Sequence, residues 1–339
     1  MKGCEDADME LNVLYGCDEN YAPYTGVSMT SLLENNKHLD VIRIYVAAQG
    51  FSEQSRERMT LLAGQYGREI IFLNTEKAEE QIQNYHCKGW NGSLPTWLRF
   101  FVLEQLPDSI DRVLWLDSDT IVCGDLSKLC GFDFEGAPIA CVCDSICYYE
   151  RFRLGFGYAE PYFNAGVISF NLKYWRENNT LDQMFKHLKD HVSKYRLNDQ
   201  DLLNDFFRGN IKKLNPVYNC QGTLQAYAKK GYWKVYPWKE EAFYLPETAL
   251  YAVDHPVVIH FFRFLGDYPW QQGRNYHPDR ELYNTWKLRS PWKDHCGMPP
   301  RKEMLFKIEK LLYVMLPKQI FLRIFSFVTN RELPKCPTT

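Results

Sequence analysis

Two aspartates, Asp117 and Asp119, come directly after the apolar run Val113-Leu114-Trp115-Leu116. A carboxylate is costly to bury in the core of a sheet unless it is paired or bound to a metal. At the end of a strand, both carboxylates can turn toward one hard divalent cation such as Mg²⁺ or Mn²⁺. Such a cation stabilises the charge that builds on a departing phosphate or diphosphate. The pair therefore predicts metal-assisted chemistry, while a turn capped by Asp119 is the structural alternative.

The same segment is also compatible with phosphatases of the haloacid-dehalogenase type. These enzymes place Asp-x-Asp after a strand and use the first aspartate, here Asp117, as nucleophile and the second, Asp119, as acid or base. They carry the motif on their first strand, however, whereas several predicted strands precede it here. No acidic pair at a later strand end completes the phosphatase set, so this hypothesis is the weaker one.

Four other polar segments lie next to predicted strands or helix starts. The loop Asp18-Glu19-Asn20-Tyr21 offers a ring for stacking and polar groups for a base or ribose, without a Gly-x-Gly-x-x-Gly motif. Asn164-Ala165-Gly166 allows a backbone to approach a ligand closely. Asn198-Asp199-Gln200-Asp201 can face sugar hydroxyls, and His260 ends a short apolar strand. Each also has a structural explanation: a polar turn, a bulge, a helix cap and a buried histidine.

A regular alternation of strands and helices must position these residues. Short apolar runs predict strands at 11–16, 41–46, 70–73, 113–116, 139–143, 166–170 and 257–259. Periodicity and capping residues predict helices at 25–34, 52–62, 96–106, 180–194 and 201–207, while the aromatic-rich stretch 214–254 allows no assignment. This alternation predicts an α/β fold with a mostly parallel, twisted sheet covered on both faces. Ligands on such sheets bind beyond the carboxyl ends of the strands, where the aspartates fall.

The composition limits the class of protein. The chain has 339 residues, with 40 Lys and Arg against 42 Asp and Glu, and this balance argues against a nucleic-acid-binding protein. The 11 cysteines are too few for a disulfide scaffold, and an odd number cannot pair completely. The sequence contains no apolar run long enough to span a bilayer and no signal-like N-terminus. We therefore expect a reduced, cytoplasmic globular protein.

The C-terminal segment has a different pattern. Apolar residues recur at helical spacing on both sides of Pro317, and basic residues accompany them. The apolar positions are Met304, Ile308, Leu311, Leu312, Met315, Ile320, Phe321, Ile324, Phe325 and Val328. Two basic amphipathic helices are typical of an anchor on a surface of anionic lipid. The alternative is that these helices pack back onto the domain.

Taken in order, the polar motifs resemble those of glycosyltransferase family 8, a retaining family that includes bacterial lipopolysaccharide galactosyl- and glucosyltransferases. The likeness extends from about Leu11 to about Trp270. It is carried by the segments Asp18–Tyr21, Thr96–Arg99, Leu116–Asp119, Tyr162–Gly166, Asn198–Asp201 and His260–Trp270. The resemblance implies a GT-A fold at residues 10–275, followed by a helical tail at residues 276–339.

The resemblance also implies a binding site for a UDP-sugar. Asp117, Asp119 and His260 would bind Mn²⁺, with Mg²⁺ as the alternative, because an imidazole ligand favours Mn²⁺. The remaining donor contacts would come from Asp18, Asn20, Tyr21, Arg99, Ser118, Asn164, Ala165, Asp199 and Gln200. Tyr21 would stack on uracil, and Gln200 would lie nearest the anomeric carbon.

The amide of Gln200 and the last motif both affect how the implied reaction would proceed. Because an amide is a poor nucleophile, front-side transfer with UDP as base is favoured over a covalent intermediate on Gln200, and Asp201 is the alternative nucleophile. The family's last motif normally runs His-x-x-Gly-x-x-Lys-Pro-Trp, whereas here it is two residues longer and Tyr268 replaces the lysine. We predict that Arg263 supplies the missing charge, since arginine binds phosphate in a bidentate manner.

The expected activity is Mn²⁺-dependent transfer of galactose or glucose from a UDP-sugar to a saccharide or glycolipid acceptor, in lipopolysaccharide or surface-glycan synthesis. A catalytically silent UDP-sugar-binding protein is a further alternative, because the last motif departs from the family pattern. We expect the protein in the cytoplasm, with the tail on the inner face of the membrane.

Overall fold

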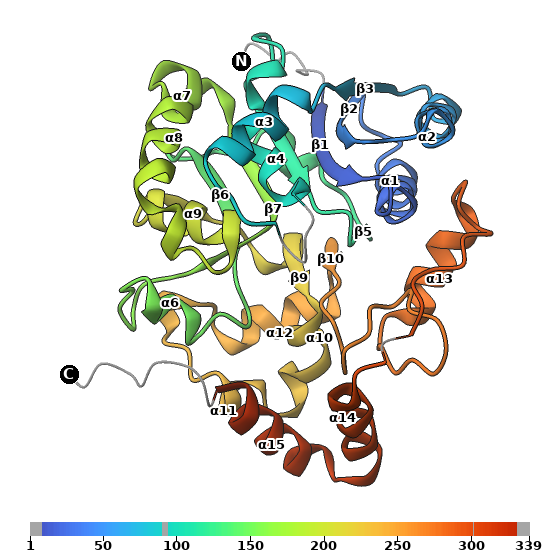
Figure 1. Ribbon diagram of the computed structural model, residues 1–339, viewed down its shortest axis with the longest axis vertical. Helices are drawn as coiled ribbons and strands as arrows, with labels where there is room; N and C mark the ends of the chain where they lie inside the picture. The colour runs from blue at the N-terminus through green and yellow to red at the C-terminus, as the bar shows by residue number, and fades with distance from the viewer. Residues whose placement is uncertain (1–8, 90–93, 301, 331–339) are drawn as a thin grey trace, which may run out of the picture.

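A sheet of seven strands lies at the centre of the described residues, which are 9–89, 94–300 and 302–330 of the computed structural model (Figure 1). Its strands are β1 (Glu10–Asp18), β2 (Val41–Gln49), β3 (Glu69–Leu73), β4 (Arg112–Leu116), β6 (Ile139–Cys143), β7 (Phe163–Asn171) and β8 (Ile211–Lys213). Their order across the sheet is β3-β2-β1-β4-β7-β6-β8. Neighbouring strands are parallel, except that β7 is antiparallel to both β4 and β6. The predicted α/β fold with a mostly parallel sheet is confirmed, with β7 as the exception.

Helices flank this sheet, as the alternating pattern predicted. The helices of the first half are α1 (Ala22–Asn35), α2 (Glu53–Gln65), α3 (Glu76–Asn84), α4 (Pro95–Phe101), α5 (Ser127–Cys130) and α6 (Glu150–Arg153). Those that follow are α7 (Leu172–Glu177), α8 (Thr180–His191), α9 (Asn198–Phe206), α10 (Gly222–Tyr227), α11 (Tyr232–Val235) and α12 (Pro246–Asp254). The last three lie in the aromatic-rich stretch that the sequence pattern left unassigned.

The first helix begins earlier than the sequence pattern predicted. It begins at Ala22 rather than at residue 25, because Pro23 fits the first helical turn, where no backbone N–H is needed. Nearly all of α1 is buried, so polarity does not mark its ends. This early start places Tyr21 at the N-cap, at the edge of the sheet where ligands are expected.

The carboxyl end of β4 is held by close packing against β1. Val113, Leu114, Trp115 and Leu116 are all buried, as a strand covered on both faces requires. Gly16 makes room for the Trp115 ring, because a Cβ at this position would lie 2.5 Å from Cη2. The packing fixes the point at which β4 ends and the two aspartates begin.

A second, smaller sheet brings a distant histidine to these aspartates. It contains β5 (Thr120–Val122), β10 (Val258–His260) and β9 (Cys220–Gln221), in the order β5-β10-β9. Antiparallel pairing sets His260 opposite Thr120, and the Phe261 N–H donates to the Asp119 carbonyl at 2.9 Å. The position of His260 therefore depends on pairing between strands that are far apart in the sequence.

The segment after residue 276 divides into two parts. The helix α13 (Arg280–Arg289) packs against α1, and Trp292 contributes to the main core. The Trp292 ring lies directly on Gly26, where a Cβ would come within 2.0 Å of it. This first part is thus integrated with the sheet domain.

The second part consists of α14 (Met304–Met315) and α15 (Lys318–Asn330), which form the lower end of the molecule in Figure 1. Both helices confirm the predicted periodicity; the part of the predicted tail beyond residue 330 lies outside the described residues. Phe321 is buried against Phe264 and Leu265, whereas Leu311 and Met315 remain exposed. Within the described part of the chain, no helix combines the length and hydrophobicity needed to cross a bilayer.

Candidate active site

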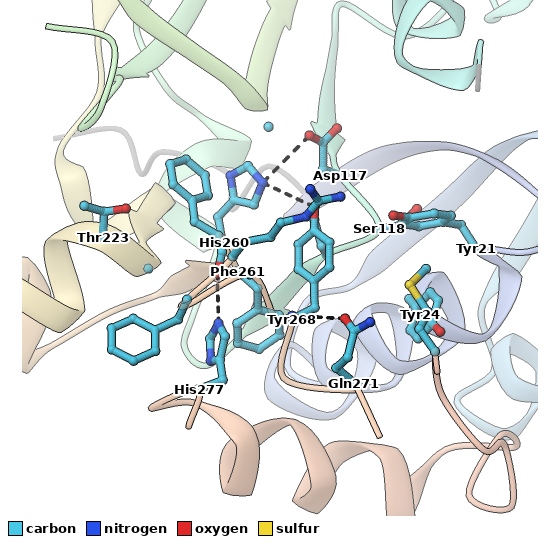
Figure 2. A pocket seen from close by; sticks show the side chains of 18 of the residues that line it. Tyr21, Tyr24, Asp117, Ser118, Thr223, His260, Phe261, Tyr268, Gln271 and His277 are labelled. Atoms are coloured by element: carbon cyan, nitrogen blue, oxygen red, sulfur yellow. Dashed lines mark hydrogen bonds and ion pairs between the residues drawn. The ribbon is translucent and has the colours of Figure 1, made fainter. Parts of the chain in front are cut away.

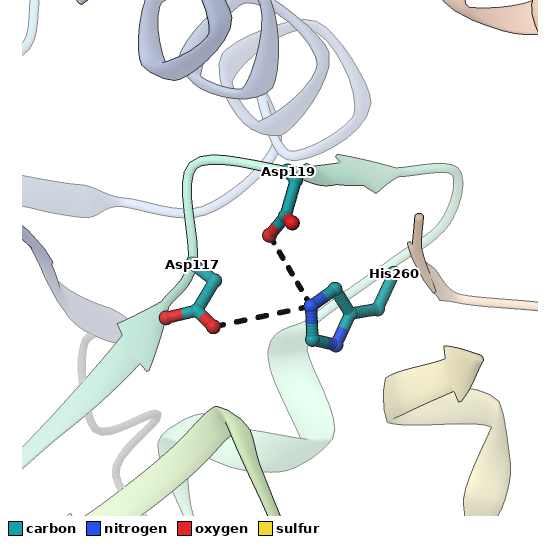
Figure 3. A group of neighbouring side chains, drawn as sticks. All are labelled: Asp117, Asp119 and His260. Carbon is teal, nitrogen blue, oxygen red and sulfur yellow. Dashed lines mark ion pairs between the residues drawn. The ribbon is translucent and has the colours of Figure 1, made fainter. Parts of the chain in front are cut away.

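Asp117, Asp119 and His260 converge at the junction of the two sheets, as Figure 3 shows. Asp117 follows β4, Asp119 precedes β5, and His260 ends β10. The imidazole Nε2 lies 3.2 Å from Asp119 Oδ1 and 3.9 Å from Asp117 Oδ2. One potential ligand atom from each residue lies within 4.8 Å of the others. The structure therefore brings together the three residues that the resemblance assigned to the metal.

The surroundings of His260 leave Nε2 as the atom that can bind a cation. Its Nδ1 lies 3.2 Å from Asn219 Oδ1, and the Asn219 amide donates to Asn164 Oδ1 at 2.8 Å. Asn219 Oδ1 therefore accepts from Nδ1–H, which leaves the Nε2 lone pair toward the carboxylates. Burial lowers the pKa of His260, but Asp119 and Asp117 outweigh this effect and raise it above the ordinary value. Two carboxylates and one oriented imidazole fit Mn²⁺ by their chemistry.

Arg99 connects the metal-binding cluster to the start of α9. The guanidinium is buried and lies 3.0 Å from both Asp117 Oδ1 and Asp199 Oδ2. Asp117 Oδ1 also accepts from Trp115 Nε1 at 2.7 Å, so that Oδ2 is the oxygen turned toward His260. Burial raises the pKa of Asp199 to about 6, although Arg99 acts in the opposite direction. Arg99 thus orients carboxylates from two separate motifs.

Gln200 is held with its amide in one orientation. Its Oε1 accepts from the Ala165 N–H at 3.0 Å and from Asn164 Nδ2 at 3.1 Å. Its Nε2 donates to Asp144 Oδ2 at 3.2 Å. Asp144 was not among the predicted site residues, although it follows β6 directly, as Asp117 follows β4.

Asp201 occupies a different environment from its neighbour Gln200. It is fully buried, and its carboxylate accepts from Tyr162 Oη at 2.6 Å and from the Arg196 N–H at 2.7 Å. The same carboxylate also pairs with Arg153. Asp201 is not among the residues that line the cavity described below. Its contacts stabilise the start of α9, and it does not lie where a nucleophile would be needed.

The loops that follow β1 and β10 both contribute residues to the cavity beside the cluster of Asp117, Asp119 and His260. Asp18, Asn20 and Tyr21 line the cavity there. Burial raises the pKa of Tyr21, and Tyr268 and Arg263 are close enough to influence it in opposite directions. Figure 2 shows Tyr21, Tyr268 and His260 around the same space.

Two more residues that were predicted to contact the sugar donor are held in place by hydrogen bonds. The Ser118 hydroxyl accepts from Thr25 Oγ1 at 2.7 Å, which ties the loop between the aspartates to α1. The backbone of Ala165 is engaged on both sides: its N–H donates to Gln200, and its carbonyl accepts from Arg99. These hydrogen bonds therefore restrict the motion of both residues at the site.

All of the predicted site residues except Asp201 line one large cavity of about 1660 Å³. Small-molecule sites commonly measure about 300–1,000 Å³, so this cavity has room for two substrates. Its far part is lined by apolar side chains of the C-terminal helices, namely Leu305, Phe306, Ile308, Leu312, Phe321, Ile324 and Phe325. These residues were not predicted to line the site, because helical periodicity indicates an apolar helix face and does not show what that face contacts.

Two known proteins with similar sequences carry the names of glycosyltransferases. A lipopolysaccharide 1,2-glucosyltransferase of Escherichia coli K12 is 27% identical, over 88% of this chain and 83% of that protein. A lipopolysaccharide 1,3-galactosyltransferase of Salmonella typhimurium is also 27% identical, over 86% of this chain and 82% of that protein.

Solved structures support the same fold. The galactosyltransferase LgtC, solved with donor and acceptor sugar analogues, has a TM-score of 0.67 at 23% identity and covers 83% of this chain and 96% of its own. The model of the family described as glycosyl transferase family 8 matches residues 12–272. No finding favours the phosphatase hypothesis. The chain belongs to glycosyl transferase family 8, and it is a glycosyltransferase with the GT-A fold.

Proposed function

We propose that this enzyme transfers galactose or glucose from a UDP-sugar to a saccharide acceptor with retention of configuration, in the synthesis of lipopolysaccharide or another surface glycan. The two relatives named above carry glucosyl- and galactosyltransferase names, which supports a hexose donor. The observation that carries the proposal is the convergence of Asp117, Asp119 and His260 on the cavity that Gln200 and Asp199 also line.

The three convergent residues would hold Mn²⁺, with Mg²⁺ as the alternative. When bound, such an ion offsets the charge of a diphosphate leaving group. The chain supplies further binding groups: Arg263 is assigned to the diphosphate, and Tyr21 to the base, with Asp18 and Asn20 beside it. Arginine suits this task because its planar group donates two parallel hydrogen bonds to phosphate oxygens.

The donor sugar is assigned to the pocket formed by Arg99, Asp199, Asn164 and Gln200. Gln200 Oε1 already accepts two hydrogen bonds, so its lone pairs are directed away from a substrate carbon. Asp201 is enclosed by its own partners. These contacts support front-side transfer, in which the departing diphosphate takes the acceptor proton and neither side chain forms a covalent bond to the sugar.

The acceptor is assigned to the far, apolar part of the cavity. Side chains of α14 and α15 line this part, while Leu311, Met315 and Phe327 of the same helices are exposed. An apolar wall beside the sugar site suits a glycolipid, and exposed apolar residues among lysines suit a membrane surface. We therefore propose a glycolipid acceptor and a peripheral position on the cytoplasmic face of the membrane.

Release of UDP from UDP-galactose and UDP-glucose, with and without Mn²⁺, tests the proposal. We expect metal-dependent release that Asp119→Asn reduces by a factor of about 100 or more, since removal of a metal ligand disables leaving-group stabilisation. Asp108→Asn, at an exposed aspartate, is the matched control and is expected to retain full activity. Release of phosphate from a phosphomonoester without a sugar donor would instead identify a phosphatase. Metal-dependent binding of UDP with no turnover would identify a silent binding protein.

A further inference from the structure

The loop that follows β10 forms a tight turn before it returns to the site. Phe264 and Asp267 pair through backbone hydrogen bonds of 2.8 and 3.1 Å, with Leu265 and Gly266 between them. Both residues at the tip have left-handed backbones, with φ of 52° at Leu265 and 80° at Gly266. A branched-chain residue such as leucine adopts this conformation only where its surroundings impose it. The turn therefore depends on what packs against it.

What packs against the turn is the helix α14. The Phe306 ring lies on Gly266, where a Cβ would come within 2.4 Å of the ring. The Lys310 ammonium lies 2.5 Å from Asp267 Oδ2. Among the described residues, Lys310 is the one cation in ion-pair distance of Asp267, and neither oxygen of that carboxylate makes a hydrogen bond.

The ion pair with Lys310 is important for the turn because the Asp267 carboxylate is both charged and buried. Its side chain is only 1% exposed, so water does not replace a lost partner. A buried charge left without its partner is strongly unfavourable, and the turn would have to open in order to hydrate it. The residues that flank the turn, Arg263 and Tyr268, both line the cavity of the donor site. The Arg263 guanidinium lies 5.1 Å from the centre of the Tyr268 ring. The Tyr268 ring in turn stacks on the Trp270 ring, with 4.7 Å between the two ring centres.

We propose that Lys310 is a positioning residue for the donor site: through Asp267 it holds the turn that presents Arg263 and Tyr268 to the nucleotide diphosphate. The C-terminal helix pair is thereby coupled to donor binding and is not only an attachment device. The inference rests on the proposed assignment of Arg263 to the diphosphate. It also gives a role to the two residues by which this motif exceeds the family pattern, because they lengthen the loop that forms the turn.

The test uses the full-length chain, with Mn²⁺ and UDP as probes. Lys310→Gln and Arg263→Ala are each expected to weaken UDP binding about tenfold, while Mn²⁺ affinity stays unchanged. Lys310→Arg keeps the charge and is expected to restore binding. Lys307→Gln, on the same helix, is the matched control. The neutral pair Asp267→Asn with Lys310→Gln removes the buried charge, so this second variant is expected to fold normally and to recover most of the UDP affinity that Lys310→Gln alone loses.

Hydrogen exchange gives a readout that does not depend on the donor. The amides of residues 263–268 are expected to exchange faster in Lys310→Gln, whereas those of β1 and β4 are unchanged. Wild-type UDP affinity and wild-type loop protection in this variant would overturn the inference and leave the proposed function intact. If the wild-type protein binds no UDP in the presence of Mn²⁺, the proposed donor is wrong, and this inference is overturned with it.

Discussion

Gly166 lies directly against the ring of His260, so closely that a Cβ on Gly166 would be 2.1 Å from the imidazole Cε1. No side chain fits between β7 and the histidine without moving one of them. The glycine belongs to the motif Asn164-Ala165-Gly166, whose small residues suggested close approach of a ligand. In the structure, the group that approaches this glycine is a protein side chain.

Gly166→Ala is therefore expected to displace the imidazole and weaken Mn²⁺ binding at least about tenfold, with about 1–3 kcal/mol lost from the free energy of unfolding by overpacking. Titration with Mn²⁺ and chemical denaturation measure the two effects. Gly64→Ala is the control, because nothing lies near a Cβ at this helical position. Unchanged metal affinity in Gly166→Ala would contradict the assignment of His260 as a ligand.

Metal binding is expected to depend on pH through His260. Its pKa in the metal-free protein is raised above 6.5, since Asp119 and Asp117 outweigh the effect of burial. Below that pKa a proton competes for Nε2, so the apparent Kd for Mn²⁺ should rise by about tenfold per pH unit. Because the pKa of His260 is raised by folding, protonated His260 adds to the free energy of unfolding of the metal-free protein below pH 6.5. This contribution to stability is lost as the pH rises through the pKa of the folded state.

Calorimetric titration between about pH 5.5 and pH 8 measures this dependence, and proton uptake by the buffer provides a second signal. His38→Gln is the control, because His38 is an exposed histidine paired with Asp125. A Kd that stays constant over the whole range would show that His260 does not bind the ion.

The contact between Gln200 and Asp144 predicts the effect of a conservative substitution. In Gln200→Glu, the atom that now donates to Asp144 Oδ2 at 3.2 Å becomes a second carboxylate oxygen. Repulsion between the two carboxylates should turn the side chain away and reduce kcat by a factor of about 100. Adding Asp144→Asn restores a donor and should recover part of the loss. Mass spectrometry is expected to find no sugar attached to either protein, and a trapped adduct on Gln200→Glu would argue for double displacement.

The exposed apolar residues of the C-terminal helices predict binding to lipid. Leu311→Ser with Met315→Ser should reduce sedimentation with anionic vesicles about tenfold or more, because each buried leucine side chain contributes about 1.5–3 kcal/mol. Leu61→Ser is the matched control, since Leu61 is similarly exposed but lies on α2. Equal sedimentation of all variants would leave the peripheral location without support.

The sequence alone determined the features that depend on local pattern. Apolar runs bounded by turn residues predicted the strands, and the aspartates after 113–116 identified the edge where ligands bind. The order of the motifs indicated the family, which the match over residues 12–272 confirmed. The predicted helix boundaries were less accurate where a helix is almost wholly buried and no polar residues mark its ends, as at the start of α1.

The tertiary structure decided which of these residues meet. The approach of His260 to Asp119 depends on the pairing of β10 with β5, which no local pattern encodes. Gln200 and Asp201 are neighbours, but successive side chains on a helix point about 100° apart, so one faces the cavity and the other the interior. The contact of Lys310 with Asp267 is likewise invisible in the sequence, because helical periodicity identifies an apolar face without showing what covers it.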